Sequence, residues 1–254
     1  MQIHVLGCSG GIGGVLRTSA FLVDEDILLD AGTGIGDLSI QALAKIDHIF
    51  LTHSHIDHIL GIPLIADTVQ SKRTRPIYIY ALEETIQSIK QHLFNWVLWP
   101  DFTILPSKHA PCITFIAIKP GESIELNNRT ITAIPVEHAV PGVAYLLDSG
   151  EASLAYSGDT TSHPPFWQAL NQANHLKYLI VETSFSDKEE ALARDAKHYS
   201  PNMLCNDLAL LKSSPEVYIT HLKPDQETLI MNEFSQHAPR QHVEQLAHGQ
   251  VLLF

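Results

Sequence analysis

The sequence predicts an α+β protein built as a four-layer αββα sandwich, in which two β-sheets pack face to face and helices cover the outer faces. Two observations support this fold class. Short apolar strands recur in both halves of the chain, and each half ends with helices. The 254 residues, 45% hydrophobic and 17% charged, supply a sizeable core and contain no linker or internal repeat. We therefore expect a single domain over residues 1–254.

The N-terminal half contains short apolar runs that glycine-rich turns and helices separate. The turns GCSGGIGG and DAGTGIG follow the first and third of these runs. Apolar runs bounded by such turns are typical of strands. We expect strands at residues 3–6, 20–23, 27–30, 48–52 and 77–81, and helices at 37–45, from 57 to 69 and at 83–94.

The middle of the chain is rich in strands, and helices become frequent after it. We expect strands at residues 113–118, 123–126, 130–135, 143–148, 153–157, 178–181, 217–220 and 251–254. We expect helices at residues 165–172, 188–196, 201–211, from 225 onward and at 241–247.

The charge balance restricts the class of partner. With 28 acidic and 16 basic residues, the formal net charge is −12. Affinity for nucleic acid depends mainly on Lys and Arg contacts to phosphates, so we expect no nucleic-acid partner. A small anionic substrate remains compatible, because a metal or a local positive cluster could hold it.

Cysteine usage and the N-terminus bear on the compartment. The three cysteines Cys8, Cys112 and Cys205 are widely spaced and form no CxxC pair, which favours a reducing environment. The opening MQIHVLGCSGG reads as a first strand and not as a signal peptide, and no apolar run reaches the ~18 residues of a membrane-spanning helix. We therefore expect a cytoplasmic protein with no membrane partner.

The run LTHSHIDHILG carries the strongest chemical signal. His53, His55, Asp57 and His58 follow an apolar strand within six residues. Residues two apart on an extended segment point the same way, so His53 and His55 can converge on one ion. Asp57 and His58 lie in the turn beyond and can face a second ion. Imidazole with carboxylate is the ligand set expected for Zn²⁺, or for Mn²⁺ or Fe, and the competing interpretation is a polar surface turn.

Three further candidates also stand directly after apolar strands. His138 ends ITAIPVEH, Asp159 ends LAYSGD and His221 ends EVYITH. One histidine after a strand is more often a surface residue, but the repeated pattern makes coincidence a weak explanation. We expect all of these side chains to meet at one edge of the sandwich.

The HxHxDH run with a later His, SGDT and a final TH resembles the metallo-β-lactamase superfamily, whose fold is the αββα sandwich. The resemblance implies two zinc ions held by seven side chains. The first ion is held by His53, His55 and His138, the second by Asp57, His58 and His221, and Asp159 bridges both. Two metals about 3.5–4 Å apart can hold a bridging hydroxide and clamp a phosphoryl oxygen. The usual hydrolytic β-lactamases differ, because they have Cys in place of the bridging Asp.

Two motifs in the C-terminal half indicate which branch of the superfamily the chain resembles. LIVETSFSD and AKHYSPNML resemble the Glu and His motifs of the phosphodiesterase branch, which includes ribonuclease Z. The resemblance implies that His198 donates a proton to the leaving oxygen, or stabilises its charge, and that Glu182 orients His198. The alternative makes His198 a neighbour of a helix N-terminus and Glu182 a polar strand end.

A closer resemblance, along nearly the whole chain, is to the class II cyclic nucleotide phosphodiesterases. The matching runs are VLGCSGG, SAFLVD, THSHIDHILGIPL, HLFNWVLWPDFT, SGDT, IVETS, HYSP and YITHLKP. Trp96 and Trp99 lie in the distinctive HLFNWVLWPDFT tract, where they could stack on a purine or only pack a helix end or a dimer surface. The chain departs from the family in having Ile56 where Leu is usual, and it lacks the N-terminal insertions of the yeast-type members.

The resemblance implies hydrolysis of 3′,5′-cyclic nucleotides, cyclic AMP or cyclic GMP, to 5′-monophosphates by a metal-bridging hydroxide that Asp57 orients. It also implies a homodimer. The alternative activity is ribonuclease Z-like cleavage at transfer RNA 3′ ends, which would need a basic segment to hold the RNA. The only basic run in the chain is SKRTR at residues 71–75. A third hypothesis is a binding protein that has lost catalysis, although such a protein would normally lack at least one of the seven ligands.

Overall fold

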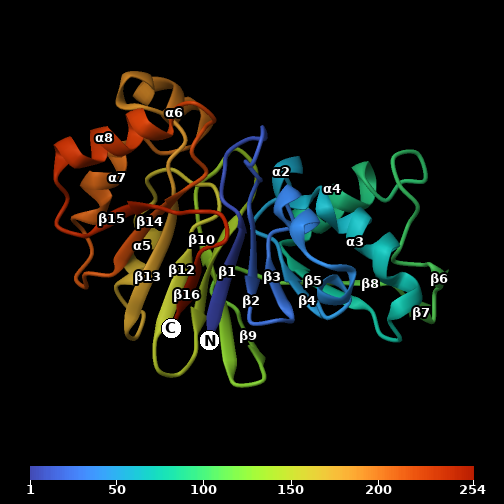
Figure 1. Ribbon diagram of the computed structural model, residues 1–254. Coiled ribbons are helices and arrows are strands. Elements are labelled where there is room, and N and C mark those ends of the chain that lie inside the picture. The colour runs from blue at the N-terminus through green and yellow to red at the C-terminus, as the bar shows by residue number, and fades with distance from the viewer.

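Two seven-stranded sheets form the centre of the computed structural model, which describes residues 1–254. The sheets pack face to face and helices cover the outer face of each, as Figure 1 shows. The predicted αββα sandwich is therefore confirmed. A separate two-stranded hairpin, β6 (Pro106–Ser107) and β7 (Ala110–Pro111), lies outside both sheets and has no counterpart among the predicted strands.

The first sheet combines antiparallel and parallel strands. Its order is β16 (Val251–Leu253), β1 (Gln2–Gly7), β2 (Ala20–Val23), β3 (Ile27–Leu29), β4 (His48–Phe50), β5 (Ile77–Ala81) and β8 (Ile113–Ala117). Strands β16 to β3 pair antiparallel, whereas β3, β4, β5 and β8 pair parallel. The C-terminal ends of these parallel strands therefore share one edge of the sheet.

The second sheet repeats this arrangement. Its order is β15 (Val243–Gln245), β14 (Glu216–Thr220), β13 (Leu176–Glu182), β12 (Ser153–Tyr156), β11 (Val143–Asp148), β10 (Arg129–Pro135) and β9 (Ser123–Leu126). Strands β9 to β12 pair antiparallel, and β12 to β15 pair parallel. Each half of the chain thus directs several strand ends toward the same side.

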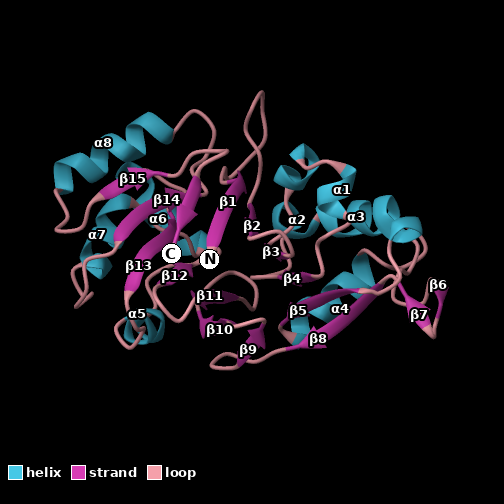
Figure 2. Ribbon diagram, turned by 60° about the horizontal axis from the view of Figure 1, so that its bottom comes forward, coloured by secondary structure: helices cyan, strands magenta, loops and turns pink.

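The helices divide between the two outer faces, as Figure 2 shows. The first sheet carries η1 (Thr33–Asp37), α1 (Ile40–Leu43), α2 (Ile56–Ile59), α3 (Gly61–Val69), η2 (Gln70–Lys72) and α4 (Glu83–His92). The second carries α5 (Pro164–Leu170), η3 (Asp187–Glu189), α6 (Glu190–Ala196), α7 (Pro201–Leu208) and α8 (Glu227–His237). None of these helices combines the length and the apolar character of a bilayer-spanning segment.

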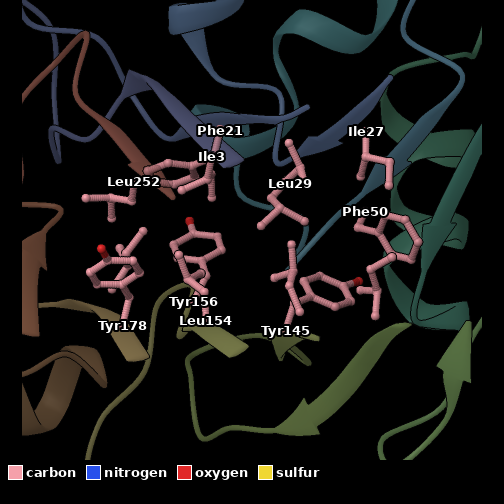
Figure 3. Packing of buried hydrophobic residues seen from close by; sticks show 14 of the residues in the cluster. Ile3, Phe21, Ile27, Leu29, Phe50, Tyr145, Leu154, Tyr156, Tyr178 and Leu252 are labelled. Atoms are coloured by element: carbon pink, nitrogen blue, oxygen red, sulfur yellow. The ribbon is translucent and has the colours of Figure 1, made fainter. Parts of the chain in front are cut away.

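Alternation along the strands builds three cores. In β11, Tyr145 and Leu147 face the space between the sheets, while Ala144 faces the helices of the second sheet. Figure 3 shows Phe21 of the first sheet opposite Tyr156 of the second, and Phe50 of the first sheet beside Tyr145. Strands buried on both faces read as continuous apolar runs, which is why their positions could be predicted from the sequence.

The predicted helix at residues 241–247 is wrong. That segment forms β15, which extends the second sheet beside β14. Val217 N donates to His242 O at 2.9 Å, and Leu246 N donates to Ile219 O at 2.9 Å. The open edge of the sheet therefore determines the conformation through pairing with distant residues, which overrides local preference.

Several predicted helices are shorter or divided in the structure. Of the helix expected at 37–45, only Ile40–Leu43 is α-helical; this helix, α1, starts where the Ser39 side chain accepts a hydrogen bond from Ala42 N, and η1 ends before it at Asp37. The helix expected at 188–196 is η3 followed by α6. The helix expected from 57 to 69 is α2 followed by α3. There Gly61 N donates to Ala31 O at 2.7 Å instead of continuing the helical ladder.

Candidate metal centre

The residues predicted as ligands lie together at one end of the sandwich. α2 marks that end, and both chain termini lie at the other (Figure 1). His53 and His55 follow β4, and His138, Asp159 and His221 follow β10, β12 and β14. The direction of the strands therefore brings together side chains that are more than 160 residues apart in the sequence. Their proximity could not be read from the sequence spacing.

Four side chains form a first group. His53, His55, His138 and Asp159 each offer a ligand atom, and these atoms lie within 4.8 Å of one another. His53 Nε2 is 3.6 Å from Asp159 Oδ2, and His138 Nε2 is 3.1 Å from His55 Nδ1. This spacing is suited to one cation between them.

Asp57, His58 and His221 form a second group within the same 4.8 Å limit. His221 Nε2 lies 3.3 Å from Asp57 Oδ2, and His58 Nε2 lies 3.7 Å from the same oxygen. Asp159 stands between the groups, because its Oδ1 is 3.4 Å from His58 Nε2 and its Oδ2 is 3.4 Å from His221 Nε2. This is the place that a ligand shared by two ions must occupy.

The unsatisfied polar atoms of the cluster test whether metal fits. His53 Nε2, His58 Nε2 and Asp159 Oδ1 are buried and have no hydrogen-bond partner. Leaving a buried polar atom unpaired costs about 1–3 kcal/mol each, so such atoms are normally satisfied. All three point into the cluster, where a divalent cation would satisfy them. The nitrogen and carboxylate set suits Zn²⁺, Mn²⁺ or Fe.

Asp30 is a functional residue that the sequence interpretation missed. It is fully buried directly after β3, and its Oδ2 lies 2.7 Å from His58 Nδ1. Asp30 also accepts hydrogen bonds from Thr52 N, Thr52 Oγ1 and Tyr156 Oη. A proton on His58 Nδ1 directs the Nε2 lone pair at the cluster. The signal was present in ILLDAG, an acidic residue directly after an apolar strand.

Three other histidines have similar outer partners. His53 Nδ1 lies 3.0 Å from Thr52 Oγ1, and His138 Nδ1 donates to Lys197 O at 3.0 Å. His221 Nδ1 lies 2.9 Å from Ser184 Oγ. The protein thus satisfies the outward nitrogen of each ring, and the inward nitrogen remains for a cation.

The electrostatics of the cluster also suit metal binding. Burial, with the neighbouring His58, holds the pKa of His53 well below its usual value, which favours the neutral ring that a cation requires. Burial raises the pKa of Asp159, but the charges of His221 and His58 outweigh it and hold that pKa well below the usual range. Burial lowers the pKa of His58, and Asp159 and Asp30 outweigh it and raise the pKa. A raised pKa means that His58 binds a proton readily, and a cation at His58 Nε2 would take the place of the proton on that nitrogen.

His198 and Glu182 form a buried pair beside the cluster. His198 Nδ1 lies 2.6 Å from Glu182 Oε1, and the His198 ring lies 5.0 Å from that of His138. Burial lowers the pKa of His198, but the Glu182 charge and hydrogen bond outweigh it and the pKa is raised. Ligand atoms of His198, Asp159 and His221 also lie within 4.8 Å of one another, so the geometry alone permits His198 as a further ligand.

The structure does not bring the tryptophan tract into this cluster. Trp96 and Trp99 lie in the connection between α4 and β6. Trp99 packs against the core under the helices of the first sheet, whereas Trp96 is 60% exposed with a φ of 65°. The backbone of Trp96 bonds within the tract, to Trp99 O. A role for either residue in substrate binding stays a prediction.

Comparison with known proteins shows the superfamily to which the chain belongs. A family model described as "Beta-lactamase superfamily domain" matches residues 25–222, and the chain belongs to the metallo-β-lactamase superfamily. The unliganded crystal structure of yeast PDE1 superposes with a TM-score of 0.83 at 20% identity, covering 100% of this chain and 99% of that one. At this identity the match establishes the fold.

The sequence relatives include two kinds of phosphodiesterase. A probable 3′,5′-cyclic-nucleotide phosphodiesterase of Yersinia pestis is 28% identical over 257 residues, which covers 89% of this chain and 72% of that protein. A ribonuclease Z of Pyrococcus abyssi is 32% identical over 127 residues, which covers only 48% of this chain and 38% of that protein. The resemblance to the cyclic nucleotide phosphodiesterases inferred from the motifs is confirmed.

Asp30→Asn should weaken Zn²⁺ binding by ~10–100-fold, because the amide no longer anchors the His58 ring as a carboxylate does. The measurement is competition with a chromophoric chelator, with metal content determined by mass spectrometry. Asp26→Asn is the matched control, since Asp26 lies at the other end of β3 and pairs with Arg129. Equal Zn²⁺ affinity for wild type and Asp30→Asn would contradict the assignment.

Proposed function

We propose that this chain is a dinuclear-metal phosphodiesterase that hydrolyses 3′,5′-cyclic nucleotides, cyclic AMP or cyclic GMP, to nucleoside 5′-monophosphates. The observation that carries the proposal is the buried His198–Glu182 pair beside a cluster of seven potential ligands. A sugar alkoxide is a poor leaving group, so its departure needs a proton donor next to the metals. The similarity to the probable 3′,5′-cyclic-nucleotide phosphodiesterase of Yersinia pestis supports the same substrate class.

In this proposal, His53, His55 and His138 would hold one divalent cation, preferably Zn²⁺, and Asp57, His58 and His221 would hold a second. Asp159 lies between the two groups and would serve both. When bound, the two cations supply a Lewis acid for a phosphoryl oxygen and a water of lowered pKa. Asp57 is a candidate ligand whose side chain is partly open to solvent, with 31% exposure. Its carboxylate accepts a hydrogen bond from the attacking water and orients it toward phosphorus.

His198 acts on the opposite side of the reaction. Its Nδ1–H donates to Glu182, so the protonated ring presents Nε2–H to the substrate. As water adds to phosphorus and the bond to the 3′-oxygen breaks, His198 gives this proton to the 3′-oxygen. Such a positioned acid contributes typically ~10²–10⁴-fold to the rate.

The basic run at residues 71–75 argues against ribonuclease Z-like activity. Arg73 and Arg75 both pair with Asp47, and Arg73 also donates to backbone carbonyls. The single Asp47 carboxylate offsets part of their charge, and a protein with a net charge of −12 offers little to a long polyanion. A small phosphodiester held at the metal edge fits this distribution better.

The purified protein with Zn²⁺ or Mn²⁺ should convert cyclic AMP or cyclic GMP into the 5′-monophosphate. Chromatographic separation of the 5′- and 3′-monophosphates measures both the activity and the bond that is cleaved. Precursor transfer RNA serves as the competing substrate. Trimming of its 3′ end, with neither cyclic nucleotide consumed, would establish the ribonuclease Z-like alternative instead.

His198→Ala should lower kcat by ~10²–10⁴-fold while metal content stays near two ions per chain, because the proposal gives His198 a proton and not a metal. Steady-state kinetics and elemental analysis of the same sample measure this. His237→Ala is the matched control, since His237 also pairs with a carboxylate, Asp187, away from the site. Loss of one ion from His198→Ala would show that His198 is a ligand.

We propose that the tryptophan tract joins two copies of the chain. Trp96, Val97 and Leu98 are 60%, 86% and 65% exposed and form one apolar projection, which is typical of an interaction surface. Trp96→Ser should therefore change the light-scattering mass from dimer to monomer. Its KM should stay within about twofold of the wild-type value, because a contact between copies does not hold the substrate. Leu192→Ser, at an isolated exposed leucine, is the control. A large rise in KM at unchanged mass would support stacking on the base.

A further inference from the structure

Ser184 occupies the junction between the second ligand group and the His198–Glu182 pair. Its side chain is fully buried, two residues beyond the end of β13. Ser184 Oγ lies 2.9 Å from His221 Nδ1, 3.2 Å from His198 Nδ1 and 3.3 Å from Glu182 Oε2. One hydroxyl thus touches a candidate metal ligand, the candidate proton donor and the carboxylate behind it.

The directions of these hydrogen bonds follow from the surroundings of each ring. His221 Nε2 faces Asp57 and Asp159 at 3.3 and 3.4 Å, the direction in which a cation would lie. His221 must then carry its proton on Nδ1, which donates to Ser184 Oγ. His198 Nδ1–H is engaged by Glu182 Oε1 at 2.6 Å. The Ser184 hydroxyl then has two acceptors at 3.3 Å, Glu182 Oε2 and the backbone carbonyl of His221. Hydrogen bonds to an ionised carboxylate are the stronger kind, which favours Glu182 Oε2.

Glu182 collects hydrogen bonds on both of its oxygens. Oε1 accepts from His198 and from Thr160 N, the residue after Asp159. Oε2 accepts from Ser184 Oγ and, at 3.4 Å, from Tyr199 N. Ser184 is the side chain that connects Oε2 to the metal cluster. Without its hydroxyl, His221 Nδ1–H and Glu182 Oε2 would each lose a partner inside the protein.

We propose that Ser184 is a positioning residue that ties the metal ligand His221 to the His198–Glu182 pair. A single hydroxyl fixes the tautomer and direction of His221 and the carboxylate that holds His198. The inference rests on the proposed function for the role of His198, whereas its metal-binding part stands independently. Two effects of one substitution follow, and different measurements detect them.

The first effect is on metal affinity. Ser184→Ala should weaken the second Zn²⁺ by ~10–100-fold and leave the first unchanged, as loss of an outer partner of a ligating histidine does. Stepwise chelator competition on the metal-free protein measures both constants without any substrate. Ser200→Ala is the matched control, because Ser200 Oγ is equally buried but has no hydrogen-bond partner. Ser184→Cys, which keeps the shape, replaces Ser184→Ala if thermal unfolding shows that the alanine variant does not fold.

The second effect is on leaving-group dependence, measured at saturating metal. A p-nitrophenolate leaves without a proton, whereas a ribose alkoxide requires one. Ser184→Ala should therefore lose at least ~10-fold more kcat on cyclic AMP than on bis(p-nitrophenyl) phosphate, in the same direction as His198→Ala. Ser184→Thr, which retains the hydroxyl, should recover much of this loss.

The outcomes separate the hypotheses. Unchanged affinity for the second Zn²⁺, together with equal loss of kcat on both substrates, would overturn the proposal and leave Ser184 a packing residue. Wild-type protein that cleaves bis(p-nitrophenyl) phosphate but no cyclic nucleotide would instead refute the proposed function. In that case the Zn²⁺ affinities alone test the role of Ser184. A loss of affinity confined to the second ion would support its role as a positioning residue for His221.

Discussion

The Asp30 carboxylate lies where the two sheets meet the metal edge, and its oxygens accept hydrogen bonds from three separate elements. Thr52 lies after β4 of the first sheet, Tyr156 ends β12 of the second, and His58 belongs to α2. The backbone of Asp30, at a φ of 54°, turns the chain out of β3. The next turn passes so close to α2 that a Cβ on Gly32 would lie 2.3 Å from Asp57 O. The contact between sheets and the direction of His58 therefore depend on the same carboxylate.

Three other candidate ligands, His53, His138 and His221, repeat this arrangement with different chemistry. A threonine hydroxyl serves His53, a backbone carbonyl serves His138 and a serine hydroxyl serves His221. These partners fix the rings before any ion arrives, so little ordering remains to be done on binding. The same organisation explains the unpaired atoms of the cluster, because rings held from outside cannot turn inward to satisfy one another.

The sequence predicted the elements whose signal is local. The grouping of the candidate ligands after β4, β12 and β14 was predicted because a polar residue after a buried strand is visible in the sequence, and parallel strands collect such residues at one edge. Asp30 shows the same pattern but lacks the spacing of a ligand motif, so it was missed. Ser184 has no distinguishing pattern at all, since its role arises from three contacts with distant residues. Residues 241–247 were mispredicted because β14, not local preference, determines their conformation.

The distribution of charge connects the fold to the proposed substrate. At the end of the first sheet away from the metal edge, Arg129 pairs with Asp24 and Asp26, and Arg73 pairs with Asp47. These cations stabilise the protein and are not free to attract an anion. A polyanion binds by displacing counterions along a line of free basic groups, and a net charge of −12 works against such binding. A substrate with one phosphodiester needs attraction only at one point. In this acidic chain, the candidate metal centre is the place that could attract the phosphodiester, because its inward-facing ring nitrogens can bind cations.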